Sequence, residues 1–125
     1  MSERTKIVPT DSELEVLQIL WQNGPQTVRF VNDEINKVRE VGYTTTLKIM
    51  QIMLEKGLLS KEIIDRSHIF TAKAEEEATQ AEMVKLFVDN TFRGSAASLV
   101  MRLLGSNDTT PDELEKIKKI INEQQ

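Results

Sequence analysis

Cysteine is absent from this chain of 125 residues, and histidine occurs once. Without cysteine the protein cannot form disulfides, zinc–thiolate centres or a thiol nucleophile. One histidine does not make a metal site, so the sequence predicts neither a metal nor any other cofactor. The lack of cysteine is also consistent with a reducing compartment, and we expect the protein to act in the cytoplasm.

Long hydrophobic runs are lacking as well. No apolar segment approaches the ~20 residues that a helix needs to cross a bilayer. The N-terminal stretch MSERTKIVPT is polar and does not contain the apolar stretch of a signal peptide. We therefore expect no direct insertion into a membrane.

The motifs that indicate an enzyme are missing too. The chain has no glycine-rich phosphate loop, no nucleophile motif and no second titratable partner for His68. The sequence predicts a protein without catalytic activity.

Positive charge is in slight deficit, and the deficit is uneven. The formal net charge is −4. Residues 1–72 hold nine Lys and Arg against ten Asp and Glu, whereas residues 73–125 hold seven against ten. Phosphate neutralisation supplies much of the affinity for nucleic acid, so an acidic chain has no general attraction to it. The nearly neutral first part can still present a local basic patch.

Helix signals open the chain. Thr10 stands three residues before Glu13, which is the spacing of a capping box. Apolar residues follow at helical spacing until the breaker sequence at 23–25. A short extended piece at 26–28 and a second helix over 29–38 are predicted next.

A third helix is predicted over 44–56, with Gly57 as its C-terminal glycine. Its predicted apolar side consists of Tyr43, Leu47, Met50 and Leu54, with Thr46 and Met53 adjacent. Its predicted polar side consists of Thr44, Lys48, Gln51 and Glu55. A helix with one polar strip packs on its apolar face and presents the strip to solvent or to a partner.

Two β-prone runs at 58–64 and 68–72, separated by a polar turn at 65–67, predict a hairpin. Three short helices followed by a hairpin are the components of a winged helix-turn-helix. The expected fold is therefore mainly α, with a small antiparallel β-sheet.

Three further helices are predicted after the hairpin, over 73–92, over 95–104 and from Thr110-Pro111 onward. Together they would form a C-terminal helical dimerisation region. The predicted domains are a DNA-binding domain at 1–73 and a dimerisation domain at 74–125.

The polar strip of the third helix has the chemistry to read DNA. Thr and Gln contact base edges, a Thr methyl can meet a thymine methyl, and Lys binds phosphate or guanine. Donors at a hairpin tip suit the DNA backbone or minor groove. The residues predicted to contact DNA are Thr44, Thr45, Lys48, Gln51, Arg66, Ser67, His68 and Arg29.

The same strip has a second interpretation, since polar helix faces are commonly just solvated. Glu55 would repel phosphate, and Ile52 occupies an edge where a basic residue would suit DNA better. The alternative is a winged-helix scaffold that binds a protein partner and no DNA. A neutral or acidic third-helix side would favour the scaffold.

Apolar stripes on the C-terminal helices predict self-association, because thin helices cannot cover each other's apolar faces. The residues predicted to form the dimer interface are Val84, Phe87, Val88, Phe92, Leu99, Val100, Leu103, Leu104, Ile117, Ile120 and Ile121.

Four segments in this order resemble the penicillinase-repressor family, also called BlaI/MecI/CopY. They are PTDSELEVLQILWQNGPQTV at 9–28, GYTTTLKIMQIMLEKGLL at 42–59, RSHIFTA at 66–72 and GSAASLVMRLLG at 94–105. The resemblance implies a homodimer that binds a palindromic double-stranded operator and blocks transcription. It also implies a membrane sensor metalloprotease system as a partner that triggers release.

Two departures from the family pattern concern the inducing signal. Antibiotic-resistance members carry a cleaved Asn-Phe bond where this chain has Arg102-Leu103. Copper-responsive members carry a C-terminal cysteine motif, and this chain has no cysteine. The resemblance therefore leaves the inducer, the operator sequence and the regulated genes open.

Overall fold

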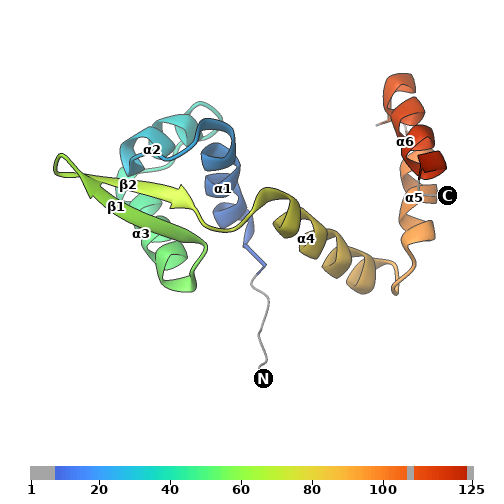
Figure 1. Ribbon diagram of the computed structural model, residues 1–125, viewed down its shortest axis with the longest axis horizontal. Helices are drawn as coiled ribbons and strands as arrows, with labels where there is room; N and C mark the ends of the chain where they lie inside the picture. Colours follow the sequence, from blue (N-terminus) through green and yellow to red (C-terminus); the bar gives the residue numbers. More distant parts are fainter. Residues whose placement is uncertain (1–7, 107–108, 124–125) are drawn as a thin grey trace. The chain divides into compact units, whose positions relative to one another are not determined.

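The computed structural model describes residues 8–106 and 109–123. Residues 1–7, on which the expectation about a signal peptide largely rests, lie outside this part. The elements follow the predicted order (Figure 1). They are α1 (Asp11–Asn23), α2 (Val28–Asn36), α3 (Tyr43–Lys56), β1 (Leu59–Ile64), β2 (Ser67–Ala72), α4 (Glu76–Thr91), α5 (Ala96–Leu104) and α6 (Pro111–Glu123).

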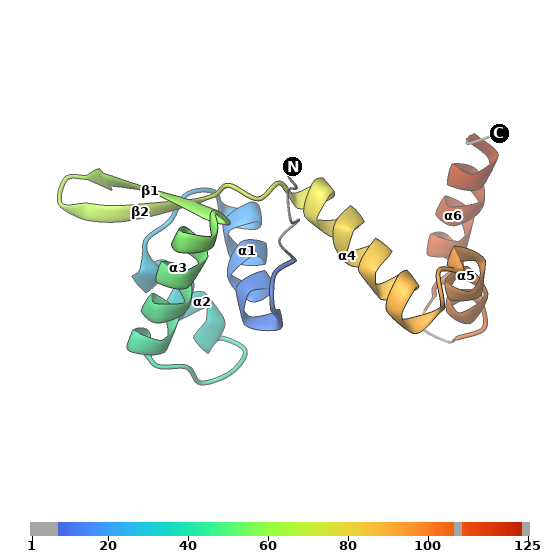
Figure 2. The same ribbon diagram turned by 90° about the horizontal axis from the view of Figure 1, so that it is seen from below.

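Two compact units divide between Glu82 and Met83, within α4. The first contains α1 to α3 and the hairpin of β1 and β2, which extends past the helices (Figure 2). The second contains the end of α4 with α5 and α6. The division into functional domains at residue 73 stays a prediction.

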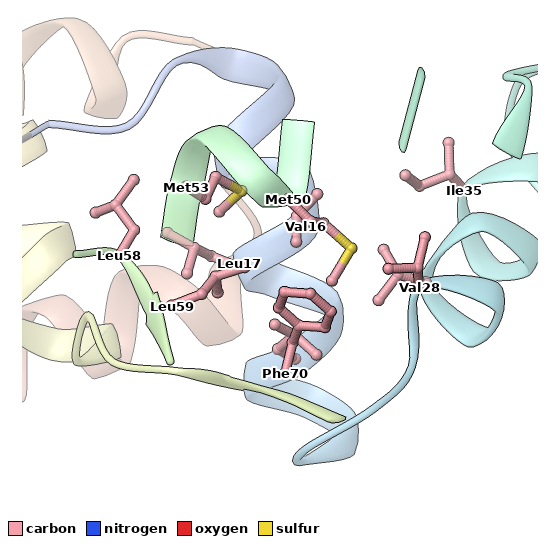
Figure 3. Close-up of a cluster of buried hydrophobic side chains, with 11 residues drawn as sticks. Val16, Leu17, Val28, Ile35, Met50, Met53, Leu58, Leu59 and Phe70 are labelled. Carbon is pink, nitrogen blue, oxygen red and sulfur yellow. The ribbon is translucent and has the colours of Figure 1, made fainter. Parts of the chain in front are cut away.

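The core of the first unit brings together one face of each helix and the base of the hairpin (Figure 3). Its buried residues are Val16, Leu17, Leu20, Val28, Val31, Ile35, Met50, Met53, Leu58, Leu59 and Phe70. Burying each large aliphatic side chain contributes about 1.5–3 kcal/mol. This shared core fixes α3 and the hairpin against α1 and α2.

Local capping explains where two of the helices begin. The Glu13 amide donates to Thr10 Oγ1 at 3.2 Å, and the Thr10 amide donates back to the Glu13 carboxylate at 2.9 Å. Thr110 and Glu113 repeat this capping box at α6, with both bonds at 3.1 Å. Each box satisfies amides that the helix leaves without acceptors.

Three predicted segments have the wrong bounds: the extended piece before α2, α2 itself and the hairpin turn. The extended piece shrinks to Gln26, which pairs with Phe70, because Thr27 already caps α2. α2 accordingly covers 28–36 rather than 29–38. The turn has two residues instead of three, since Ser67 pairs with Ile64.

The long helix also begins later than predicted, at Glu76 instead of residue 73. The amides of Lys73 and Ala74 donate to the Leu58 carbonyl at 2.8 and 3.1 Å, and the Trp21 indole donates to the Ala74 carbonyl at 2.9 Å. These tertiary hydrogen bonds hold the segment in a non-helical conformation, which no local signal indicates.

Candidate nucleic-acid interface

The junction between α2 and α3 sets the orientation of α3. Asn32 is buried, and its amide donates to the Thr46 hydroxyl at 2.8 Å and to the Val41 carbonyl at 3.1 Å. The Asn36 side chain forms two hydrogen bonds with the Val41 backbone. It donates to the carbonyl at 2.8 Å and accepts from the amide at 3.1 Å. The buried pair of Asn32 and Thr46 fixes α2 against α3, because a shift of either helix would leave a buried polar group without its hydrogen bond.

The polar strip of α3 is exposed as predicted, at Thr44, Lys48 and Gln51, and Thr45 beside it is exposed too. The apolar side predicted for α3 faces the core, with Met50 fully buried and Leu47 and Leu54 partly buried. The fully buried residues of α3 are Thr46, Met50 and Met53. Packing on α1 and α2 selects this face, which leaves Tyr43 at its edge with 40% of its surface exposed.

The hairpin turn carries backbone strain at Arg66. Asp65 and Arg66 have positive φ angles of 50° and 70°, and β1 and β2 pair directly on either side of them. Such a turn favours glycine or asparagine, and the left-handed conformation costs an ordinary L-residue roughly 1–2 kcal/mol. Strain retained at an exposed arginine suggests a function for that side chain.

A groove of about 570 Å³ runs between α3, the start of α2 and the hairpin. Among the described residues that line it, three are cationic, none is acidic, and Gln51 connects it to the polar strip. The lining residues that carry a polar group are Thr27, Arg29, Tyr43, Gln51, Lys61, Arg66, Ser67 and His68. We call this surface the cationic groove.

Ion pairing separates the cations at the cationic groove and on the polar strip of α3 from the other cations of residues 8–72; beyond them, Lys73 has no ion pair with a described residue either. Three cations between residues 8 and 72 lie outside these two surfaces, and all three are paired. Lys37, Arg39 and Lys56 lie 2.6, 2.6 and 2.7 Å from Glu34, Glu15 and Glu13. The other four, Arg29, Lys48, Lys61 and Arg66, form no ion pair with any residue that the structure describes.

Of the DNA-contact residues predicted from the sequence, the structure brings Arg29, Gln51, Arg66, Ser67 and His68 to the cationic groove. Those remaining are exposed on α3. Thr44 and Lys48 line a neighbouring hollow of about 540 Å³ with Gln51, Ile52 and Glu55. Thr45 is not among the residues that line the cationic groove or this hollow.

Three of the residues that line the cationic groove with a polar group were not predicted as site residues, and the first of them is Thr27, which caps α2. Lys61 pairs with Phe70 and shares a strand face with buried Leu59, so strand alternation could have placed it on the side facing α3. Tyr43 lies under Arg29, whose guanidinium carbon is 4.8 Å from the ring centroid. No sequence pattern reveals that contact, because it joins α2 to α3.

The residues predicted to form a dimer interface are mostly uncovered within the chain. Val88 is buried, and Phe92, Leu99 and Ile117 are half-buried, with Phe92 edge-on to Phe87 at 5.6 Å. The exposed ones are Val84, Phe87, Val100, Leu103, Leu104, Ile120 and Ile121. Neither α5 nor α6 contains a buried residue.

In the part of the chain that the structure describes, no group of three or more His, Asp or Glu side chains gathers to hold a metal ion. None of the helices at 8–106 and 109–123 combines the length and apolar character of a membrane span.

Comparison with known proteins gives a consistent set of relatives. The family model for the penicillinase repressor matches residues 9–123. The chain is 22% identical to the methicillin resistance regulatory protein MecI of Mammaliicoccus sciuri over 113 residues, covering 90% of this chain and 92% of the relative. It is 36% identical to the transcriptional regulator BlaI of Mycobacterium tuberculosis over 59 residues, which are 46% and 43% of the two chains.

A solved structure shares the fold. The Bacillus licheniformis BlaI monomer, determined in complex with the blaP half-operator, superposes with a TM-score of 0.50 at 23% identity. The match covers 62% of this chain and 92% of that one.

Proposed function

The chain belongs to the penicillinase repressor family, and we propose that it represses transcription as a homodimer bound to a palindromic operator. Members of this family are transcriptional regulators rather than enzymes, which agrees with the missing catalytic motifs. The action would take place in the cytoplasm, where the protein meets its double-stranded DNA.

The four cations on the face formed by α2, α3 and the hairpin, which form no ion pair with any described residue, carry this proposal. A chain with a net charge of −4 would be expected to neutralise its lysines and arginines where it can, and it does so at the three other cations of residues 8–72. Leaving Arg29, Lys48, Lys61 and Arg66 free creates a basic surface suited to phosphates. The cationic groove argues against the protein-binding scaffold, for which we expected a neutral or acidic side, although Glu55 and Ile52 line the hollow beside Lys48.

We assign base reading to the exposed strip of α3. Thr44 and Thr45 can meet thymine methyls and base edges, and Gln51 can form two hydrogen bonds with adenine. Lys48 lies between them and can reach a phosphate or guanine. Ser67 and His68 at the hairpin would add donors for the DNA backbone.

The homodimer is supported by the uncovered apolar side chains of α4, α5 and α6. A second copy would bury them and place two α3 helices on one palindrome, with half-sites about 34–36 Å apart. Release by a membrane sensor metalloprotease system remains part of the family expectation, although Arg102-Leu103 replaces the Asn-Phe bond.

A titration with the chain's own promoter tests the function. We expect binding at low micromolar protein that weakens as salt rises, because each phosphate contact releases counterions. Lys48→Glu should abolish operator binding and leave the dimer intact in sedimentation. Lys37→Glu is the matched control, since Lys37 is also exposed but lies outside the cationic groove and the polar strip of α3. Unchanged binding by Lys48→Glu would mean that the face is assigned wrongly.

A further inference from the structure

The cationic groove and the strip of α3 offer different chemistry to DNA. The strip carries threonines, a glutamine and one lysine, which suit base edges. The groove concentrates Arg29, Lys61 and Arg66, with no acidic residue among its described lining. Base edges do not need that excess of positive charge, whereas a phosphodiester does.

Arg29 is held in place at the groove by Tyr43. Its guanidinium stacks over the tyrosine ring at 4.8 Å, and Tyr43 is the first residue of α3. A stacked arginine keeps its hydrogen-bond donors in a fixed plane, so little further entropy is lost when it binds an anion. The pair couples the start of α2 to the start of α3.

The start of α3 adds to the positive potential at this place. Gly42 is its N-cap, and no side chain accepts a hydrogen bond from the first amides of the helix. Such amides and the helix dipole favour an anion. Lys61 approaches from the hairpin, where it shares a strand face with His68 and Phe70.

We propose that the cationic groove is a phosphate anchor, which takes one backbone phosphodiester of the bound strand through Arg29, Lys61 and Arg66. Tyr43 is a positioning residue, because it acts through Arg29. This inference rests on the proposed DNA-binding function and assigns separate roles to the groove and to the strip of α3. The groove supplies affinity for any sequence and sets the register, and the strip of α3 selects the sequence.

The test compares single variants of the full chain on its operator and on a random duplex of equal length, over a range of salt. Arg29→Ala and Lys61→Ala should each weaken both duplexes by the same factor, about tenfold for each protomer that loses a charged hydrogen bond. Each should also lower the slope of log K against log salt by about 1 per protomer. Arg39→Ala is the control, because Arg39 pairs with Glu15 away from the groove and should change neither quantity.

Tyr43 variants test the positioning role. Tyr43→Leu should weaken both duplexes about two- to fivefold, which is the range of an exposed cation–π contact, and should leave the salt slope unchanged. Tyr43→Phe keeps the ring and should restore wild-type affinity. Equal losses in the Leu and Phe variants would overturn the stacking argument.

The anchor and the repressor function fail in different ways. The anchor is overturned if Arg29→Ala and Lys61→Ala keep the wild-type salt slope, or if they weaken the operator alone, which would make them base readers. The proposed function fails if the wild-type protein does not prefer its operator to the random duplex. Binding of an acidic peptide but no duplex would overturn both.

Discussion

Glu13 connects the capping of α1 to the end of α3. Its carboxylate is buried, accepts the Thr10 amide and lies 2.7 Å from the Lys56 ammonium. Burial, the largest single influence, raises the pKa of Glu13. The hydrogen bonds from Lys56 and Thr10 and the charge of Lys56 act together in the other direction, and the pKa ends below its ordinary value of 4.5.

The lowered pKa predicts a loss of stability in acid. Because the folded state holds the charged form more strongly than the unfolded state, the stabilisation is present above pH 4.5 and is lost as pH falls through the folded pKa. Glu13→Gln keeps a capping acceptor but removes the charge. It should lower the free energy of unfolding at pH 7 by about 1 kcal/mol, a modest value because Lys56 is 39% exposed.

Urea unfolding at neutral and acidic pH measures this difference. The gap between wild type and Glu13→Gln should close as the pH falls below 4.5. Asp11→Asn is a matched control in the same helical turn, where Asp11 is exposed. A gap that stays constant with pH would show that the charge of Glu13 does not contribute.

Single residues differ in how well the sequence predicts them. The exposure of Thr44, Lys48 and Gln51 follows from helical periodicity alone. The unpaired state of Lys48 does not, because it depends on which carboxylates lie within reach after folding. For that reason the net charge was a poor guide to the local charge of the proposed binding face.

At the scale of elements, the hairpin combines strain with charge at its tip. Arg66→Gly should relieve about 1–2 kcal/mol of left-handed strain and lose about 0.5–1 kcal/mol to the greater freedom of unfolded glycine. The net expectation is a stabilisation of about 0.5–1 kcal/mol together with at least about fivefold weaker operator binding, because a phosphate contact is lost.

Opposite changes in stability and affinity distinguish this variant from one that merely damages the fold. Urea unfolding gives the first quantity and fluorescence anisotropy with labelled operator gives the second. Asp65→Asn should leave both nearly unchanged, since asparagine also tolerates positive φ. Operator affinity that survives Arg66→Gly would remove Arg66 from the proposed interface.

Element boundaries were predictable where the stop or start signal is local. The capping box at Thr10 and Glu13 and the left-handed Gly57 mark helix ends within a few residues. The start of α4 was not predictable from local signals, because the Leu58 carbonyl and the Trp21 indole form hydrogen bonds with the segment before it. Those partners lie far away in the sequence.

For the molecule as a whole, the C-terminal helices lack a core of their own. α5 and α6 bury no residue, and Ile120 is 56% exposed. Each aliphatic side chain buried at an interface contributes about 1.5–3 kcal/mol, and a symmetric dimer buries it twice. Covering these helices with a second copy would therefore stabilise the proposed dimer substantially.

Ile120→Asp should weaken the dimer at least about a hundredfold, since two apolar contacts are replaced by two carboxylates. Sedimentation equilibrium at micromolar protein should show monomers, and operator affinity should fall with the loss of the second reading helix. Lys119→Asp places the same carboxylate one residue away at an exposed position and should preserve the dimer. A dimer that persists in Ile120→Asp would place the interface on other residues.

The sequence by itself determined the order of the elements, the winged-helix fold class and the polar strip of α3. These depend on periodicity, caps and glycines, which act over a few residues. Only the tertiary structure decided which residues of α3 are fully buried, the contact of Arg29 with Tyr43 and the place of Lys61 in the groove. Each of these depends on packing between α2, α3 and the hairpin, so the cationic groove exists only once those elements meet.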